Sequence, residues 1–304
     1  MISFRYHLIS VIAIFLAIAL GVVVGTTALN GAVVGDLRRQ VSDLKDTNAQ
    51  SQAANKALQA KAGNADELAN AYGSKILGGA LAKKSVVLLA APGVSASLLD
   101  GIGAELTAAG GTVSARLQLT KSFLDPQRAS DIRSLATTTQ PIGLDYPTTD
   151  DVGTLAGSLL GFVLLGKGAA TDLSQVLSGF GQLGMIQASG SNPAAGQAVV
   201  LVSSATMAKD DPAAMMLVSL AGAIGSAGPT VVADAGGGVA DAGGLVSLLR
   251  GDADAGKSVA TVDDAGDTLG QLTVALTVAD SLKGHHGDYG AGAGADALLP
   301  GAAG

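Results

Sequence analysis

The side chains best suited to chemistry lie near the C-terminus, where His285 and His286 are followed by Asp288 and Tyr289. Imidazole and carboxylate groups are suitable ligands for Cu(II) or Zn(II). The segment is rich in glycine, and a solvated turn without a metal is the ordinary explanation for such a sequence. We take His285, His286 and Asp288 as the candidate metal ligands and keep the solvated turn as the alternative.

Three methionines offer a softer kind of ligand. The thioethers of Met207, Met215 and Met216 have the chemistry that Cu(I) prefers. Met215 and Met216 are neighbours, however, and two neighbours cannot both face one site from a regular helix. Packing in the hydrophobic core is therefore the interpretation that we favour for these residues.

The sequence shows no recognisable set of catalytic residues beside these groups. The chain has no cysteine, which excludes a thiolate nucleophile, a zinc ribbon and an iron–sulfur cluster. A G-x-S-x-G pattern is absent, and Leu106 occupies the position where Gly101 and Gly103 would need a third glycine to bind a dinucleotide. Asp263 and Asp264 could be a carboxylate pair or a metal site, but we favour capping of the following helix. The sequence thus predicts a protein that is not an enzyme.

The overall composition restricts the kinds of molecule that the chain can bind. The chain has 304 residues, a formal net charge of −7, 48% hydrophobic residues and 14% charged residues. These proportions are typical of a folded chain rather than a disordered one. Binding to nucleic acid needs clustered Lys and Arg, and the sequence has no such cluster. We therefore exclude nucleic acid as a partner.

The longest apolar segment is close to the N-terminus, at residues 8–29, and it carries no charge. An α-helix of about 22 residues spans roughly 33 Å, enough for the core of a bilayer. A buried core helix and a signal peptide cleaved near Ala17-Ile18-Ala19 are the alternatives. We expect an uncleaved membrane anchor, with a short head of residues 1–7 in the cytoplasm and the rest of the chain outside it.

Two features of the N-terminal third predict association between copies of the chain. Small residues recur every fourth position of the apolar segment, which lets two membrane helices approach closely; they are Ala13, Ala17, Gly21 and Gly25. A heptad pattern follows over residues 30–72, and its best seam residues are Val34, Leu37, Val41, Leu44 and Leu58. This pattern predicts a coiled-coil stalk, interrupted near Gly63, in a homodimer or a higher homo-oligomer.

Residues 83–283 alternate between short apolar runs and helical patterns. Strands are expected near 85–91, 112–119, 198–204, 230–235 and 258–264, and helices near 96–109, 126–135, 150–165, 172–183, 212–227 and 268–282. Such alternation predicts an α/β domain with a parallel, Rossmann-like sheet. The loops after Ala91, Ser204 and Ala235 are then candidate ligand positions. We expect residues 284–304 to form a flexible, glycine-rich tail.

The chain resembles the actinobacterial MctB family, the copper transporters of the mycobacterial cell envelope. The resemblance rests on an ordered set of segments, which are the opening MISFRYHLISVIAIFLAIALGVVVG and residues 83–87, 110–113, 119–120, 258–264, 274–276 and 284–290. It implies an envelope protein with a role in copper efflux and homeostasis. It also implies copper as the metal, with the histidine pair as the only part of a histidine-rich C-terminal segment that this chain retains.

Two functions remain open at this stage. One is the copper role implied by the resemblance. The other is a membrane-anchored scaffold that recruits or regulates a cell-wall enzyme or another envelope protein through its stalk and α/β domain. A pore is not supported by the residues, because one uncharged transmembrane helix cannot line a channel alone.

Overall fold

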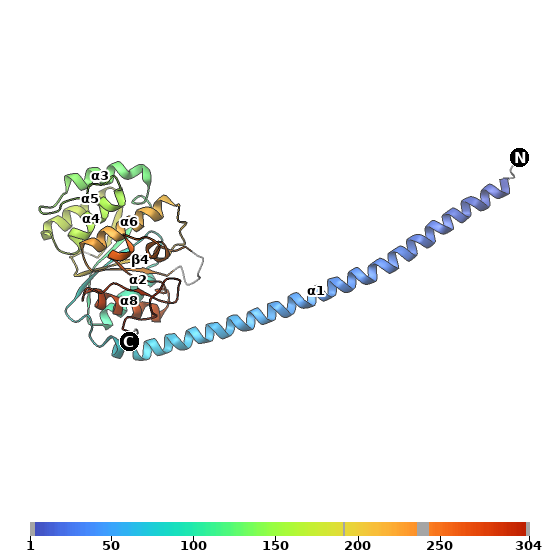
Figure 1. The fold of residues 1–304 in the computed structure, drawn as a ribbon, viewed down its shortest axis with the longest axis horizontal. Coiled ribbons are helices and arrows are strands. Elements are labelled where there is room, and N and C mark those ends of the chain that lie inside the picture. Colours follow the sequence, from blue (N-terminus) through green and yellow to red (C-terminus); the bar gives the residue numbers. More distant parts are fainter. Residues whose placement is uncertain (1–3, 191, 236–242, 302–304) are drawn as a thin grey trace. The chain divides into compact units, whose positions relative to one another are not determined.

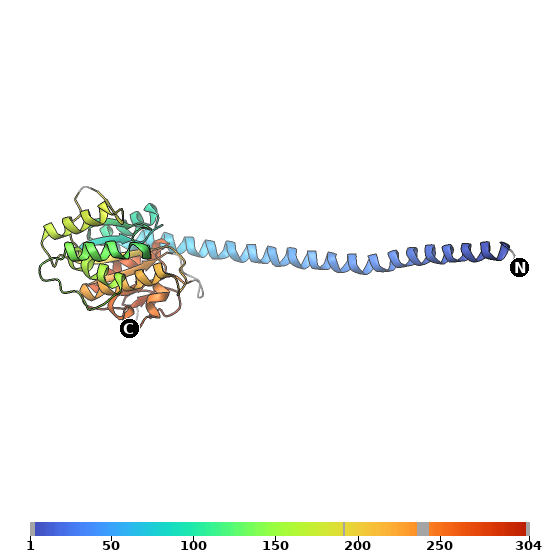
Figure 2. The same cartoon turned by 90° about the horizontal axis from the view of Figure 1, so that it is seen from above.

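The computed structural model describes residues 4–190, 192–235 and 243–301. The chain divides into two compact units, with the boundary between Asn64 and Ala65. Figure 1 and Figure 2 trace the helical first unit and the α/β second unit, which we call the body.

The predicted membrane span and stalk are parts of a single helix, α1 (Phe4–Leu77). We expected the coiled-coil pattern to be interrupted near Gly63, and the helix itself continues through this residue. A glycine inside a helix costs only about 1 kcal/mol relative to alanine. The good helix formers on both sides compensate for so small a penalty.

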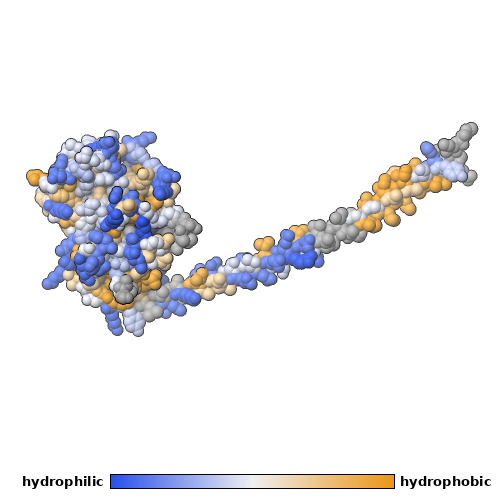
Figure 3. Space-filling model, viewed as in Figure 1, coloured by the Kyte–Doolittle hydropathy of each residue, from blue (hydrophilic) through white to orange (hydrophobic). Residues whose placement is uncertain are grey.

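Among the described residues, one helical segment is long and apolar enough to cross a membrane, and it is Tyr6–Gly25, with a mean hydropathy of 2.9. Figure 3 shows its side chains as a nearly continuous apolar band. A Cβ atom placed on Gly21 or Gly25 would meet nothing within 4 Å in the chain. The small residues on this stripe therefore serve no packing contact within one copy of the described chain.

The last turns of α1 belong to the body, so the stalk is shorter than the predicted 30–72. Ala69 and Leu77 are buried, and a Cβ on Gly73 would come within 3.0 Å of Leu272. The carboxylate of Asp66 accepts a hydrogen bond of 3.1 Å from the backbone N–H of Thr268. A helical pattern alone did not reveal where the exposed stalk gives way to a packed helix.

The body contains a seven-stranded sheet in the order β3-β2-β1-β4-β5-β6-β7. Its strands are β1 (Ser85–Ala90), β2 (Thr112–Leu119), β3 (Ile186–Ser189), β4 (Ala198–Ser203), β5 (Thr230–Asp234), β6 (Ala260–Val262) and β7 (Asp288–Tyr289). The five predicted strands are confirmed as parallel neighbours. Two strands were not predicted: β3, which is antiparallel to β2, and β7, which extends the sheet beyond β6.

Helices cover both faces of the sheet. Figure 1 shows α2 and α8 on one side and α3 to α6 on the other. The helices of the body are α2 (Ala96–Ala108), α3 (Ala129–Thr138), α4 (Val152–Leu164), α5 (Ala170–Gln182), α6 (Pro212–Ala227), α7 (Leu245–Arg250) and α8 (Thr268–Ser281), with 3-10 turns at Pro126–Arg128 and Gly256–Ser258. The body is thus a three-layer α/β unit.

Close contact between α4 and α6 depends on glycine. Gly153, Gly157 and Gly161 recur every fourth residue along α4 and face α6. A Cβ on Gly157 would lie 2.6 Å from the carbonyl oxygen of Leu220. No side chain can be accommodated at that distance, so glycine sets the separation of these two apolar helices.

Candidate functional site

The carboxyl ends of β4, β5 and β6 meet at one edge of the sheet, where α/β proteins commonly bind ligands. Ser203 on β4 is in register with Asp234 on β5, and Ala233 is in register with Val262, so Asp263 comes next to Asp234 at this edge. Ser203, Asp234 and Asp263 are buried. Of the loops that we predicted as ligand positions, the one after Ala235 lies outside the described residues.

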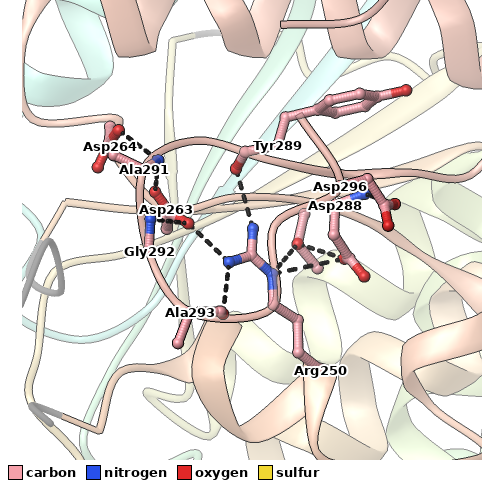
Figure 4. Close-up of polar contacts among 10 residues, drawn as sticks. Arg250, Asp263, Asp264, Asp288, Tyr289, Ala291, Gly292, Ala293 and Asp296 are labelled. Atoms are coloured by element: carbon pink, nitrogen blue, oxygen red, sulfur yellow. Dashed lines mark hydrogen bonds and ion pairs between the residues drawn. The ribbon is translucent and has the colours of Figure 1, made fainter. Parts of the chain in front are cut away.

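A buried arginine lies beside the carboxyl end of β6 and binds residues from several segments (Figure 4). Arg250, at the end of α7, and Asp263, just after β6, form an ion pair of 2.6 Å, with side chains that are only 6% and 5% exposed. The guanidinium Nε donates a hydrogen bond to Thr261 Oγ1 at 2.9 Å. Its other nitrogens donate to the carbonyl oxygens of Tyr289, at 2.9 Å, and Ala293, at 3.1 Å. We call these five residues the Arg250 cluster.

The Arg250 cluster holds the glycine-rich C-terminal segment in place. The two carboxylate oxygens of Asp263 accept hydrogen bonds from the backbone N–H groups of Ala291, at 2.9 Å, and Gly292, at 3.0 Å. Gly290 adopts φ +123°, and a Cβ on it would lie 2.0 Å from Asp263 Oδ1. The expectation of a flexible tail over 284–304 is therefore wrong for residues 287–297, which are held by backbone hydrogen bonds and by the buried carboxylate of Asp263.

The capping role that we predicted for Asp263 and Asp264 is also wrong. Asp267 begins α8 instead, and its carboxylate accepts a hydrogen bond of 2.7 Å from the backbone N–H of Gly270. Asp264 shares the N–H of Ala291 with Asp263, at 3.0 Å. Burial, and then the hydrogen bond and negative charge of Asp263, raise the pKa of Asp264 to about 6.

This raised pKa makes the stability of the body depend on pH. A carboxyl group whose pKa is higher in the folded than in the unfolded chain favours folding in its protonated form, so its contribution is lost as the pH rises from about 4 towards about 6. We expect Asp264→Asn, which cannot ionise, to gain thermal stability relative to the parent chain across this range and to keep that gain at higher pH. Thermal midpoints of both chains at several pH values measure the difference, and a difference that is independent of pH would contradict the expectation.

The three predicted metal ligands do not converge on one point. His285, which is 68% exposed, places Nδ1 2.9 Å from Asp280 Oδ1. His286 and Asp288 line a separate cavity of about 390 Å³, and Asp288 Oδ1 accepts a hydrogen bond of 2.5 Å from Thr261. Throughout the described ranges, no group of three His, Asp or Glu side chains is placed to hold a metal ion.

The Asp280 carboxylate connects His285 to the sheet. Its second oxygen accepts a hydrogen bond of 3.2 Å from the hydroxyl group of Tyr289. Burial, followed by the negative charge of Asp280, raises the pKa of Tyr289 to about 12. The tyrosine hydroxyl therefore stays protonated and continues to donate to Asp280 at physiological pH.

The methionines have different environments. Met216 is partly buried against the core, as we predicted, but Met215 is 60% exposed, which contradicts the prediction that it packs in the core. Met207 and Met215 line one cavity of about 650 Å³ beside the start of α6. Their position in sequence gave no sign of this shared cavity, since the two residues lie on a loop and on a helix.

Sequence reasoning did not identify Arg250 as a key residue. Its only signal is a single cation that ends the otherwise apolar run Leu245–Arg250. A charge at the end of such a run is usually solvated, and only the tertiary structure reveals that this one is buried with a carboxylate from a different element.

Comparison with known proteins gives matches over nearly the whole chain. A family described as “Copper transport outer membrane protein, MctB” matches residues 1–300. The “Copper transporter MctB” of Mycobacterium tuberculosis H37Rv is 31% identical over an alignment covering 97% of this chain and 98% of that protein. The protein of the same name from Mycobacterium leprae is 28% identical, covering 98% of this chain and 99% of its own length.

Proposed function

This chain belongs to the MctB family of copper transport outer membrane proteins, and from this premise we propose that it acts in copper efflux and homeostasis as a membrane-anchored protein of the cell envelope. The observation that carries the proposal is the extent of the match, which includes the apolar helix, the body and the C-terminal segment. Copper is the cargo in this proposal, not a resident cofactor.

The topology is a second part of the proposal. Tyr6–Gly25 is the anchor, residues before it lie in the cytoplasm, and the body lies outside the cytoplasm. Its length, its hydropathy of 2.9 and its exposed side chains support an anchor rather than a core helix. Membrane fractionation with a carbonate wash tests the anchor: an integral protein stays in the pellet, whereas a mature product that washes free would contradict it.

Within this proposal, His285 is the primary Cu(II) ligand. A carboxylate bonded to one ring nitrogen commonly orients a histidine so that its other nitrogen binds a metal. Asp280 occupies Nδ1 at 2.9 Å, and the exposed ring presents Nε2 to solvent. His286 and Asp288 line a separate cavity and are not placed to share that ion.

A calorimetric titration of the full chain in detergent with Cu(II) tests this ligand set. We expect the binding heat of the parent chain to be lost in His285→Ala/His286→Ala, because both imidazoles are removed. His7→Ala is the matched control, since it removes the remaining histidine of the chain, and it should retain the heat. Equal heats in the double variant would refute the ligand assignment. Unchanged copper tolerance of cells after deletion of the gene would refute the copper role itself.

A second candidate function is a non-enzymatic scaffold that recruits or regulates a cell-wall enzyme or another envelope protein. It is supported by apolar seam residues on α1, since Leu37, Val41, Leu44 and Leu58 are about half exposed or more. Exposed apolar side chains at heptad spacing are typical of helices that bind another helix. Capture of envelope proteins by the full chain, compared with Leu44→Ser/Leu58→Ser, tests it: identical captured proteins would contradict binding through the stalk.

A further inference from the structure

The cavity lined by Met207 and Met215 lies apart from the Arg250 cluster and from the histidine pair. It is formed by the loop after β4, the first turns of α6 and the segment around α7. Its location next to the carboxyl end of β4 is where α/β proteins tend to bind ligands. The volume of about 650 Å³ leaves ample room for an ion to enter and for side chains to adjust around it.

Both thioethers are carried by segments whose backbone is fixed. The backbone N–H of Met207 donates a hydrogen bond to the carbonyl oxygen of Gly243 at 2.5 Å, which ties the loop to the chain just before α7. Met215 lies in the first turns of α6, where Asp211 caps the helix and Pro212 occupies its first position. Two methionines from independently supported elements thus line one cavity.

Core packing does not explain the position of Met215. Methionine is usually among the more buried residue types, and Met185 of this chain is fully buried. Met215 is instead 60% exposed, and Met207 is partly buried against the core while it also lines the cavity. Flexible, polarisable thioethers at the surface of a cavity are available to bind a ligand.

The two thioethers of this lining suit a soft monovalent cation. Thioethers prefer Cu(I), and the chain has no thiolate that would compete for it. Asp252 also lines the cavity, and its Oδ1 is held by the backbone N–H groups of Asp254, at 3.0 Å, and Ala255, at 2.8 Å. This carboxylate supplies a negative charge, whereas the ammonium group of Lys209 in the same lining disfavours a cation.

We propose that Met207 and Met215 bind Cu(I) in this cavity, with Asp252 providing the compensating charge. This inference deepens the proposed copper function and rests on it for the identity of the cargo. It divides copper binding by oxidation state: the thioethers take Cu(I), and the exposed imidazole of His285 takes Cu(II). No electron transfer between the two sites is involved.

The test uses the full chain in detergent, without oxygen, and measures competition for Cu(I) against a coloured Cu(I) chelator. We expect Met207→Leu/Met215→Leu to weaken the apparent affinity by at least about tenfold. Met216→Leu is the matched control, on the same helix but directed against the core, and should stay within about twofold. Lys209→Gln should bind more tightly than the parent chain, because a nearby positive charge is removed.

A second measurement uses NMR chemical shifts instead of competition, with a metal ion that does not change its oxidation state. Silver(I), a redox-inert substitute for Cu(I), should shift the ¹³C-methyl resonances of Met207 and Met215 and leave that of the buried Met185 unchanged. The site is refuted if the double variant competes for Cu(I) as well as the parent chain, or if silver(I) shifts neither resonance. If the site is present but gene deletion leaves copper tolerance unchanged, the proposed function fails and the site stands. If copper tolerance depends on the gene but both thioether tests fail, the site fails and the proposed function stands.

Discussion

Arg250→Met lowers the free energy of unfolding of the body by about 3–5 kcal/mol, the cost expected when one partner of a buried ion pair is removed. The methionine fills similar space but leaves the charge of Asp263 buried, with only the N–H groups of Ala291 and Gly292 to stabilise it. It also removes the hydrogen bonds to Tyr289 and Ala293. Urea unfolding of the full chain, followed by tyrosine fluorescence, measures the loss, and hydrogen exchange of residues 288–297 should accelerate.

Arg116→Met is the matched control for this experiment. Arg116 also pairs with an aspartate, Asp100, but the two side chains are 35% and 68% exposed. Exposed pairs contribute about 0–1 kcal/mol, so the control should lose little stability. Equal losses in the two variants, or unchanged exchange of residues 288–297 in Arg250→Met, would mean that the Arg250 cluster does not hold the C-terminal segment.

We expect Gly21→Ile/Gly25→Ile to weaken the self-association that the stripe of small residues predicts. Because a Cβ at either position meets nothing within 4 Å inside one chain, the substitution leaves the fold of a single copy undisturbed. Bulky side chains do, however, prevent two membrane helices from approaching along the stripe of small residues. We expect association of the full chain in detergent, measured by sedimentation equilibrium, to weaken at least about tenfold, or about 1.4 kcal/mol.

The control for association places the same bulk on another side of the helix. Ala19 lies nearly opposite the stripe, so Ala19→Ile should preserve the oligomer. Leu44→Ser should weaken it by a separate route, through the heptad seam of the stalk. A parent chain that sediments as a monomer, or a Gly21→Ile/Gly25→Ile chain that sediments like its parent, would contradict self-association through this stripe.

The parts of the fold that the sequence predicts well are those specified by local patterns. Continuous apolar runs such as Val86–Leu89 are typical of a strand buried on both faces, and β1, β4 and β5 lie where they were expected. Helix α4 likewise lies where it was expected, and Asp151 caps it by accepting a hydrogen bond of 2.7 Å from the backbone N–H of Thr154. Signals of this kind are contained within a few residues.

The parts that were missed depend on contacts between distant residues. β7 has two residues and no pattern of its own, and it is ordered because its neighbours bind Asp263 and Arg250, which lie far away in the sequence. The end of the stalk was missed for the same reason, since only the contact with α8 distinguishes residues after 64 from those before. At the candidate site, His285 and His286 are adjacent in the sequence, which suggested that they bind one metal ion. In the structure His285 contacts Asp280, whereas His286 lines a separate cavity.

The short strands at the two ends of the sheet have a consequence for how copies can meet. An exposed, long edge strand offers unpaired backbone groups to a strand from another molecule, and proteins avoid such aggregation by keeping edge strands short. Here β7 has only two residues and β3 only four. Many copies can therefore be concentrated at one surface without their sheets joining edge to edge.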